Sequence, residues 1–341
     1  MSKRIITVLL AAVLIISVLS GCGSSSGTAA TSGSDEKCDV NVGLIMGPPS
    51  MGLGWFMNEV SQGNTYNNFS LTVDGMDYSA LAASLNDGTY DIINAPSNVA
   101  AILYNNEDLQ VGVKVISINN TGLLHVVTTD PSIKTIEDLA GKNVYSIGEG
   151  GTPEYALKHC LELCDLTDSV NLSFKSTPFE VLNILQQEEN AVAVLPQPFV
   201  EVAKTMVDDL LIPVDLTEVW NEKEPSGTET ITTVTIVRDD FLEAHEQAVI
   251  EFLQMCKKST DYTNKHVDEA AEWTDTYGTF MNPEIATDAI PECSICTITG
   301  DEMKEKLSGF IEIMYNMNPE AVGGAIPGDD FYYIPEKGAI K

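Results

Sequence analysis

The chain has 341 residues, of which 44% are apolar and 7% aromatic, which is enough apolar material for two cores of ordinary size. Asp and Glu number 50 against 18 Lys and Arg, so the formal net charge is −32 at pH 7. A charge of this sign and size is repelled by nucleic acid and by anionic headgroups, which argues against both as partners, and the scattered acids indicate a solvated acidic surface.

The N-terminus has the pattern of a bacterial secretory signal. Lys3 and Arg4 are followed by an almost unbroken apolar run over residues 5–19, too short for a membrane span of about 20 residues. The run ends in Leu-Ser-Gly-Cys22, which resembles a lipoprotein cleavage box; the alternative is a plain secretory signal with an incidental cysteine. The resemblance implies a signal peptide over residues 1–21 and a lipid on Cys22.

Residues 22–37 predict a disordered linker. Until the charges near its end, this segment holds no residue larger than Thr, so it cannot form a core. Its expected coil span of about 20 Å would let a folded body move freely above a membrane.

Between residues 38 and 122, short apolar runs alternate with helical patterns. Strands are predicted over residues 40–46, 71–73, 90–94 and 111–118. Ser79 and Ser97 stand where N-caps of the intervening helices are expected. Such alternation implies right-handed crossovers and a mainly parallel sheet.

A second unit follows over residues 123–231. Its strands are predicted over residues 123–129, 143–147, 191–195 and, at an edge, 211–214, and Thr152-Pro153 opens a helix. The chain then returns with a strand over 231–237 and a long amphipathic helix, whose start resembles a capping box from Asp240 to Glu243. We expect the tail over residues 323–341 to pack as irregular structure on the first lobe.

No metal site, cofactor or catalytic constellation is predicted. The four histidines lack His-x-x-x-His and His-Glu-x-x-His spacing, and no Walker loop or Gly-x-Ser-x-Gly elbow follows a predicted strand. Cys293 and Cys296 have CxxC spacing without a second pair, which argues against a zinc ribbon. Besides Cys22, the cysteines are interpreted as mostly structural, with their disulfide pairing left open: Cys38, Cys160, Cys164, Cys256, Cys293 and Cys296.

Four stretches have the order and spacing of a known family. Residues 91–98 (DIINAPSN) form a strand and loop, 132–142 end in Asp-Leu-Ala-Gly-Lys, 148–155 are a Gly-rich loop opening a helix, and 191–198 are a strand before Pro-Gln-Pro. Residues 47–52 match a Gly-Pro variant. Over residues 39–265 the chain thereby resembles the nitrate/sulfonate/taurine-binding family, which includes the thiamine-pyrimidine-precursor binding proteins.

The resemblance implies an α/β, two-lobed periplasmic-binding-protein fold of type II. Two mainly parallel sheets with helices on both faces would be joined by two crossing strands, with lobe 1 over residues 38–122 and 232–341 and lobe 2 over 123–231. The implied function is the capture component of an ABC importer: a monomer on the extracellular face of the bacterial membrane that delivers a small molecule to a permease with a cytoplasmic ATPase. The alternatives are a surface sensor without a transporter and, in a related fold, a pyrimidine-synthase-like enzyme.

The loops at the carboxyl ends of the strands are the predicted ligand site. Helix N-termini there leave backbone N–H groups unpaired, which suits a polar or anionic ligand group. Gly150 and Gly151 allow close approach of the backbone, and Glu149 suits a ligand amine. Each hydroxyl residue, taken alone, is also explained as a helix cap. The predicted ligand-binding residues are Pro49, Ser50, Met51, Ala95, Pro96, Ser97, Asn119, Glu149, Gly150, Gly151, Thr152 and Gln197.

Positive charge is missing from these loops. Arg238 is the only arginine beyond the predicted signal peptide, and no Lys or Arg stands in the candidate loops. A desolvated sulfonate or nitrate would gain from a bidentate arginine, although helix N-termini can replace it. The ligand is therefore left open between a sulfonate/taurine-like and a pyrimidine/amine-like molecule, with a neutral, zwitterionic or amine-bearing one favoured.

Overall fold

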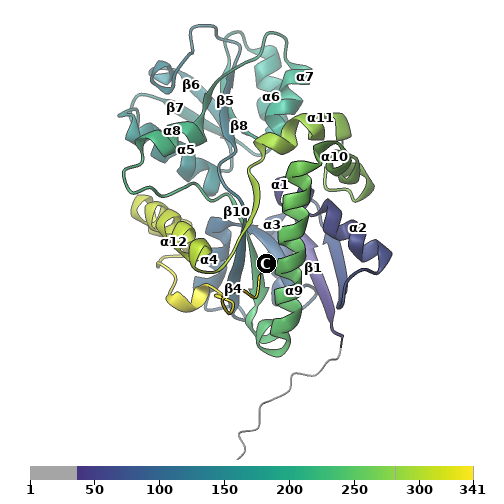
Figure 1. Ribbon diagram of the computed structural model, residues 1–341. Helices are drawn as coiled ribbons and strands as arrows, with labels where there is room; N and C mark the ends of the chain where they lie inside the picture. The colour runs from purple at the N-terminus through teal and green to yellow at the C-terminus, as the bar shows by residue number, and fades with distance from the viewer. Residues whose placement is uncertain (1–36, 281, 341) are drawn as a thin grey trace, which may run out of the picture. The chain divides into compact units, whose positions relative to one another are not determined.

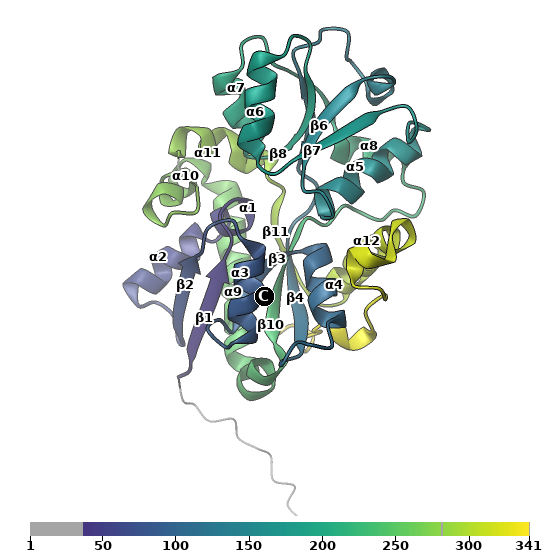
Figure 2. The same ribbon diagram turned by 180° about the vertical axis from the view of Figure 1, so that it is seen from behind.

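A computed structural model describes residues 37–280 and 282–340. The predicted signal peptide, Cys22 and all but the last residue of the predicted linker lie outside the described residues. Two β-sheets with their helices make up the described part (Figures 1 and 2).

The first sheet has six strands in the order β11-β4-β10-β3-β1-β2. Strand β1 is parallel to β2 and β3, whereas β10 lies antiparallel between β3 and β4, and β11 is antiparallel to β4. Its strands are β1 (Asp39–Leu44), β2 (Asn68–Val73), β3 (Ile92–Pro96), β4 (Val113–Asn120), β10 (Thr233–Arg238) and β11 (Ile295–Ile298).

The second sheet has five strands in the order β7-β6-β8-β5-β9. Strand β6 is parallel to β7 and β8, and β5 is antiparallel to β8 and β9. Its strands are β5 (Leu124–Thr128), β6 (Asn143–Ile147), β7 (Asn171–Lys175), β8 (Val192–Pro196) and β9 (Leu211–Asp215). The prediction of an edge strand near residues 211–214 is confirmed.

Both sheets are mixed: most of their strands run in one direction, as expected, whereas β10 and β11 in the first sheet and β5 in the second run the opposite way. Strand β4 leads into β5 through residues 121–123 without a crossover helix, and β10 re-enters the first sheet from the side of the second. A strand that arrives from that side runs opposite to β3 and β4, so its pairing with both is antiparallel.

The two segments that join the sheets lie side by side. One is residues 121–123, and the other is residues 224–232, which connect α8 to β10. Thr232 donates its backbone N–H to the Asn120 carbonyl at 3.0 Å and its hydroxyl to the Thr121 carbonyl at 2.6 Å. Hydrogen bonds thus tie the outgoing chain to the returning chain.

Helices cover both faces of each sheet, as expected. They are α1 (Pro48–Met51), α2 (Gly54–Gln62), α3 (Tyr78–Asn86), α4 (Ser97–Asn105), α5 (Thr152–Leu163), α6 (Pro178–Gln187), α7 (Phe199–Met206), α8 (Leu216–Lys223), α9 (Asp239–Lys265), α10 (Val267–Thr276), α11 (Pro283–Ala289) and α12 (Gly300–Met317). Short 3₁₀ turns are η1 (Ile136–Leu139), η2 (Ile290–Glu292), η3 (Pro319–Val322) and η4 (Asp329–Phe331).

Alternate residues of the central strands supply the two cores of the second sheet. In β5, Val126 packs in the cluster that holds Leu157 of α5 and Trp220 of α8, whereas Val127 packs with Val181 of α6 and Val200 of α7. This alternation follows from the two-residue period of a strand, which sends neighbouring side chains to opposite faces.

The helix caps differ from two of the predictions. Asp77, not Ser79, caps α3, since its carboxylate accepts the backbone N–H groups of Ser79 and Ala80 at 2.9 and 3.2 Å. The capping box at Asp240 does not form, because α9 begins at Asp239 without a side-chain cap.

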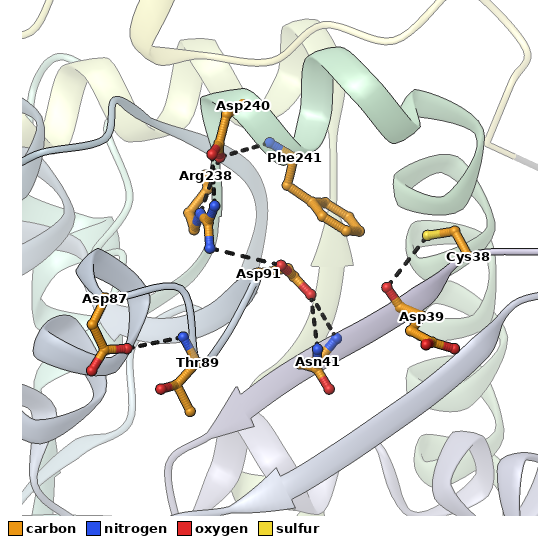
Figure 3. Close-up of polar contacts among 9 residues, drawn as sticks. All are labelled: Cys38, Asp39, Asn41, Asp87, Thr89, Asp91, Arg238, Asp240 and Phe241. Atoms are coloured by element: carbon orange, nitrogen blue, oxygen red, sulfur yellow. Dashed lines mark hydrogen bonds and ion pairs between the residues drawn. The ribbon is translucent and has the colours of Figure 1, made fainter. Parts of the chain in front are cut away.

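The Asp240 carboxylate does not cap α9 but accepts hydrogen bonds from Arg238, the last residue of β10 (Figure 3). Its guanidinium donates to both Asp240 oxygens at 3.0 and 2.6 Å and lies 3.9 Å from Asp91. Asp91 in turn accepts the Asn41 backbone N–H at 2.9 Å. Burial raises the pKa of Asp91, while the bonds from Asn41 and the charge of Arg238 act in the opposite direction. This arginine ties β1, β3 and α9 together.

The C-terminal tail packs on the first sheet, as predicted. Tyr333 donates its backbone N–H to the Val115 carbonyl of β4 at 2.9 Å, and Gln254 of α9 donates to the Ala339 carbonyl at 2.7 Å. Apart from the single turn η4, residues 323–340 form neither helix nor strand.

Candidate functional site

Two predicted loops, one from each sheet, meet in hydrogen-bonding contact. Ser97 begins α4 directly after β3, and Thr152 begins α5 after β6 and its Gly-rich loop. Their hydroxyl oxygens lie 3.2 Å apart, and both side chains are buried. Strand β3 is parallel to β1, and β6 is parallel to β8. The loops that follow β3 and β6 therefore lie at the carboxyl ends of parallel strands, as the sequence analysis expected for these two positions.

Neither hydroxyl acts as the helix cap that the sequence suggested for Ser97. The Ser97 hydroxyl donates to the Ile231 carbonyl at 2.6 Å, and the Thr152 hydroxyl donates to the Asn98 side-chain oxygen at 3.0 Å. Each hydroxyl has one proton, so a bond between the two requires one of them to release its present acceptor. The two hydroxyls are therefore in contact while each donates to a different acceptor.

Asn98 was missed by the sequence analysis, yet it makes the most contacts here. Its amide N–H group donates to the Gly150 carbonyl at 3.3 Å and to the Ala321 carbonyl at 3.4 Å, while its oxygen accepts from Thr152. Tyr155 of α5, three residues after Thr152, accepts a hydrogen bond from the Asn318 side chain at 3.0 Å. Residues of α4, α5 and the chain after α12 are thus joined by side-chain hydrogen bonds.

The N-terminus of α5 already holds a carboxylate. Gly150, with φ of +75°, donates its backbone N–H to Glu154 at 2.6 Å. Glu154 is buried and also pairs with Lys158. Because this carboxylate occupies the N–H group, it disfavours an anion at the position where the sequence suggested one. Glu149 is exposed, and Gly151 is half-buried as the residue before α5.

The predicted residues on α1 serve packing. Pro49 and Ser50 are buried, and the Ser50 hydroxyl donates to the Gly47 carbonyl at 3.0 Å. Met51 is fully buried in an apolar cluster that includes Phe280 and Ile290. Within the described residues, Ser50 makes no hydrogen bond to Ser97 or Thr152, so the structure does not bring α1 into their polar contact.

A buried polar cluster lies between the strands of the first sheet. Asn119 of β4 exchanges hydrogen bonds with Thr235 of β10 at 2.9 and 3.1 Å, and Asn94 of β3 donates to Thr235 at 3.1 Å. The side-chain oxygen of Asn94 has no partner among the described residues. The predicted residues Ala95 and Pro96 continue β3 from Asn94, buried and half-buried respectively.

Gln197 lies at a separate place, in an open groove of about 590 Å³ beside the second sheet. Its amide donates to Glu201 of α7 at 3.2 Å, and its own side-chain oxygen is buried without a partner in the described part of the chain. We call this "the acidic groove" after the residues that line it: His125, Gln197, Val200, Glu201, Lys204, Ile212, Asp215, Glu218, Asp288 and Glu292.

Residues 37–280 and 282–340 contain neither a candidate metal site nor a disulfide bond. No group of three or more His, Cys, Asp or Glu side chains there is arranged to hold a metal ion. The six cysteines in these ranges are free thiols, including Cys293 and Cys296. In the same ranges no helix is both long and apolar enough to cross a bilayer.

A family model described as "NMT1/THI5 like" matches residues 86–270, which is more than half of the chain. The chain belongs to the NMT1/THI5-like family. The match includes all four stretches on which the sequence-based resemblance rested and the whole of α9, so the family prediction is confirmed. No curated protein matches the chain.

Several solved structures similar to this NMT1/THI5-like chain carry titles that name transport or solute-binding proteins. An ABC transporter protein from Parabacteroides distasonis has 23% identity and a TM-score of 0.70, with 87% of this chain and 99% of that chain covered. The periplasmic aliphatic sulphonate binding protein SsuA from Escherichia coli has 12% identity and a TM-score of 0.69, with 87% and 92% covered. The alkanesulfonate-binding SsuA from Xanthomonas axonopodis pv. citri, bound to MOPS, has 10% identity and a TM-score of 0.62, with 85% and 94% covered.

These likenesses establish the fold. With its two mixed sheets and the helices that cover them, the NMT1/THI5-like chain has the two-lobed periplasmic-binding-protein fold of type II. At such identities the ligands named for the similar proteins remain properties of those proteins.

Proposed function

We propose that this protein is the extracellular, lipid-anchored solute-binding component of an ABC importer. It captures a small organic molecule between two closing lobes and delivers it to a permease, without converting it chemically. In this proposal lobe 1 comprises residues 38–122 and 232–341, lobe 2 comprises residues 123–231, and the lipid is attached to Cys22.

The contact between Ser97 and Thr152 carries this proposal. These buried hydroxyls belong to loops that follow parallel strands of different sheets, and such loops are where ligands bind in open α/β sheets. Both hydroxyls are buried, so a ligand reaches them only when the segments around them move apart. Binding and the relative position of the two loops are therefore coupled.

Capture would act as a population shift. A ligand that contacts both loops binds the arrangement in which they face each other more tightly than any other arrangement, so it shifts the population toward it. Each hydroxyl has one proton, so it donates to a ligand atom only by leaving its present acceptor, the Ile231 carbonyl for Ser97 and the Asn98 side-chain oxygen for Thr152.

The family and the fold support this function. The chain belongs to the NMT1/THI5-like family, and two of the similar solved structures carry titles that describe sulfonate-binding proteins. The sequence-based signal peptide, Cys22 and linker agree with a binding protein held outside the cell. The ligand proposed here is a small organic molecule, sulfonate/taurine-like or pyrimidine/amine-like.

The test is a ligand screen followed by substitution. A thermal-shift screen of sulfonates, pyrimidines, amines and amino acids is expected to raise the Tm with at least one class, because a ligand of the folded state stabilises it by mass action. Replacing Ser97→Ala together with Thr152→Ala is then expected to weaken binding roughly tenfold in calorimetry, since two hydrogen bonds are removed.

A matched control replaces one exposed and one half-buried hydroxyl that bond only within their own helices, Thr205→Ala and Ser308→Ala. This control should retain the affinity of the unmodified chain. Equal affinity in the Ser97 and Thr152 variant would contradict the role of these residues. Failure of every ligand class to raise the Tm would contradict the function itself.

A further inference from the structure

We propose that the acidic groove beside Gln197 binds the ammonium group of a small organic cation. This inference rests on the proposed solute-binding function and adds to it a second site, apart from the contact of Ser97 with Thr152, for an amine-bearing molecule.

The floor of the groove presents a buried acceptor without a donor. Gln197 is 3% exposed, and the orientation of its amide is fixed because its N–H group donates to Glu201 at 3.2 Å. The opposite orientation would place an oxygen against a carboxylate. Gln197 lines the groove, its amide oxygen is buried without a partner among the described residues, and a buried acceptor requires a donor.

Glu201 adds negative charge to the same floor. It is 5% exposed, and one of its oxygens accepts both from Gln197 and from Lys204, whose Nζ lies 2.7 Å away. Lys204 itself is exposed, so the ion pair is open to solvent on one side. The other Glu201 oxygen makes no hydrogen bond within the described ranges.

The rim carries more carboxylates than cations. Glu218, Asp288 and Glu292 are exposed and form no ion pair in the part of the chain described, while Asp215 caps α8 by accepting the Thr217 N–H at 2.7 Å. With Glu201, the lining holds five carboxylates against the single amine of Lys204, and His125 is counted as neutral. Burial, then the charges of Glu292 and Glu201, raise the pKa of neighbouring Cys293, which places both carboxylates around one point.

Size and composition point to an organic cation. A volume of about 590 Å³ is that of a small-molecule site, which typically measures about 300–1,000 Å³. A bare metal ion would need three or more closely grouped ligand side chains, and the described residues contain no such group. A sulfonate would meet the surplus of negative charge, whereas an ammonium would pair with it and donate to the Gln197 oxygen.

The experiment titrates the full chain with organic cations in a calorimeter. The panel is 1,4-diaminobutane, n-butylamine and tetramethylammonium, with 1,4-butanediol, butane-1-sulfonate and Ca²⁺ alone as comparison probes. At least one amine is expected to bind, and the diol and the sulfonate are expected not to. The variant with Asp288→Asn and Glu292→Gln should bind that amine roughly tenfold more weakly, because two rim charges are lost.

The matched control removes two exposed carboxylates of α12 that do not line the groove, Asp301→Asn and Glu305→Gln. It should bind as the unmodified chain does, which separates a local effect from the change in net charge. Gln197→Met, which keeps the side-chain length but removes the acceptor, should also weaken binding, with its Tm in the absence of ligand confirming that it folds.

Three results would overturn the inference: no cation binds, the groove variant binds as tightly as the control, or Ca²⁺ alone binds in a groove-dependent way. If sulfonates or pyrimidines raise the Tm while every cation fails, the inference is wrong and the solute-binding function stands. If no ligand of any class binds, the function itself fails.

Discussion

Asp130, which follows β5, illustrates how a single carboxylate makes stability depend on pH. It accepts hydrogen bonds from Lys142 at 2.7 Å and from the Ser132 backbone and hydroxyl at 2.9 and 2.6 Å. These bonds, that of Lys142 foremost, lower the pKa of Asp130 from 3.8 to about 2. Its contribution to stability is therefore present above pH 3.8 and is lost as the pH falls toward 2.

We predict that Asp130→Asn changes the acid limb of the stability curve. Urea unfolding at pH values from about 6 to about 2 should show a free-energy difference between the original chain and the variant that shrinks as the pH falls. Asp301→Asn, at an exposed position without a side-chain hydrogen bond in the described chain, serves as the control. A difference that is constant with pH would contradict the assignment.

The buried thiols give a second prediction at this scale. Burial raises the pKa of Cys160 and Cys296 to about 12 and that of Cys256 and Cys293 further still. The thiolate is the reactive form, so these four should be alkylated slowly in the folded protein. By exposure of the whole residue, Cys38, Cys164 and Cys296 are half-buried, whereas Cys160, Cys256 and Cys293 are buried.

Mass spectrometry after iodoacetamide treatment at about pH 8 should find Cys38 and Cys164 modified first. In denaturant all six of these thiols should react at similar rates, which controls for the reagent. Fast modification of Cys256 in the folded protein would show that α9 opens readily.

At the scale of elements, the segment from β4 to β5 is constrained by a close approach. A Cβ atom at Gly122 would lie 2.3 Å from the hydroxyl oxygen and 3.0 Å from the Cβ of Thr217, in the first turn of α8. Gly122→Ala should therefore destabilise the fold by about 1–3 kcal/mol, as overpacking does.

A double-mutant cycle checks this prediction. Thr217→Ala removes the hydroxyl and methyl groups that meet the new Cβ but leaves the backbone N–H that Asp215 accepts. The double variant should thus recover part of the stability lost in Gly122→Ala, measured by urea unfolding. If the two effects simply add, the clash with Thr217 is not the cause.

Strands with strong apolar runs could be predicted from the sequence, but which strands pair with each other could not. The sequence placed β6 and the positions of β1, β4, β5 and β8 within a few residues, because buried strands show as apolar runs. It missed β7 and β11, short edge strands with half-exposed residues, and the helices α10 to α12. The direction of pairing depends on where the chain comes from, which no local pattern records.

At the candidate site, too, the sequence predicted some of the residues in contact and missed others. Ser97 and Thr152 were predictable, since each follows a recognisable strand. Asn98 was missed because its partners Gly150 and Ala321 are far from it in sequence. Glu154 was also missed, although its partners Gly150 and Lys158 are each only four residues away. The acidic groove was also missed, because α7 and the α11–η2 segment are far apart in sequence.

At the scale of the whole molecule, the chain passes between the two sheets twice, and residues that follow strands of the two sheets also contact each other at Ser97 and Thr152. The returning crossing, residues 224–232, also holds one partner of this contact, since the Ser97 backbone N–H donates to the Thr232 carbonyl at 3.1 Å and its hydroxyl donates to the Ile231 carbonyl. Movement of the returning segment would therefore be felt directly at the hydroxyl pair.

The position of β10 determines the order in which the chain can acquire its structure. Strands β3 and β4 do not pair with each other; β10 lies between them and pairs with both. A ribosome must release residues as far as Arg238 before that gap is filled, and until then the facing edges of β3 and β4 stay open to wrong partners. The second sheet needs only β5 to β9, a continuous stretch, so the unit that starts later in the gene is complete before the one that starts first.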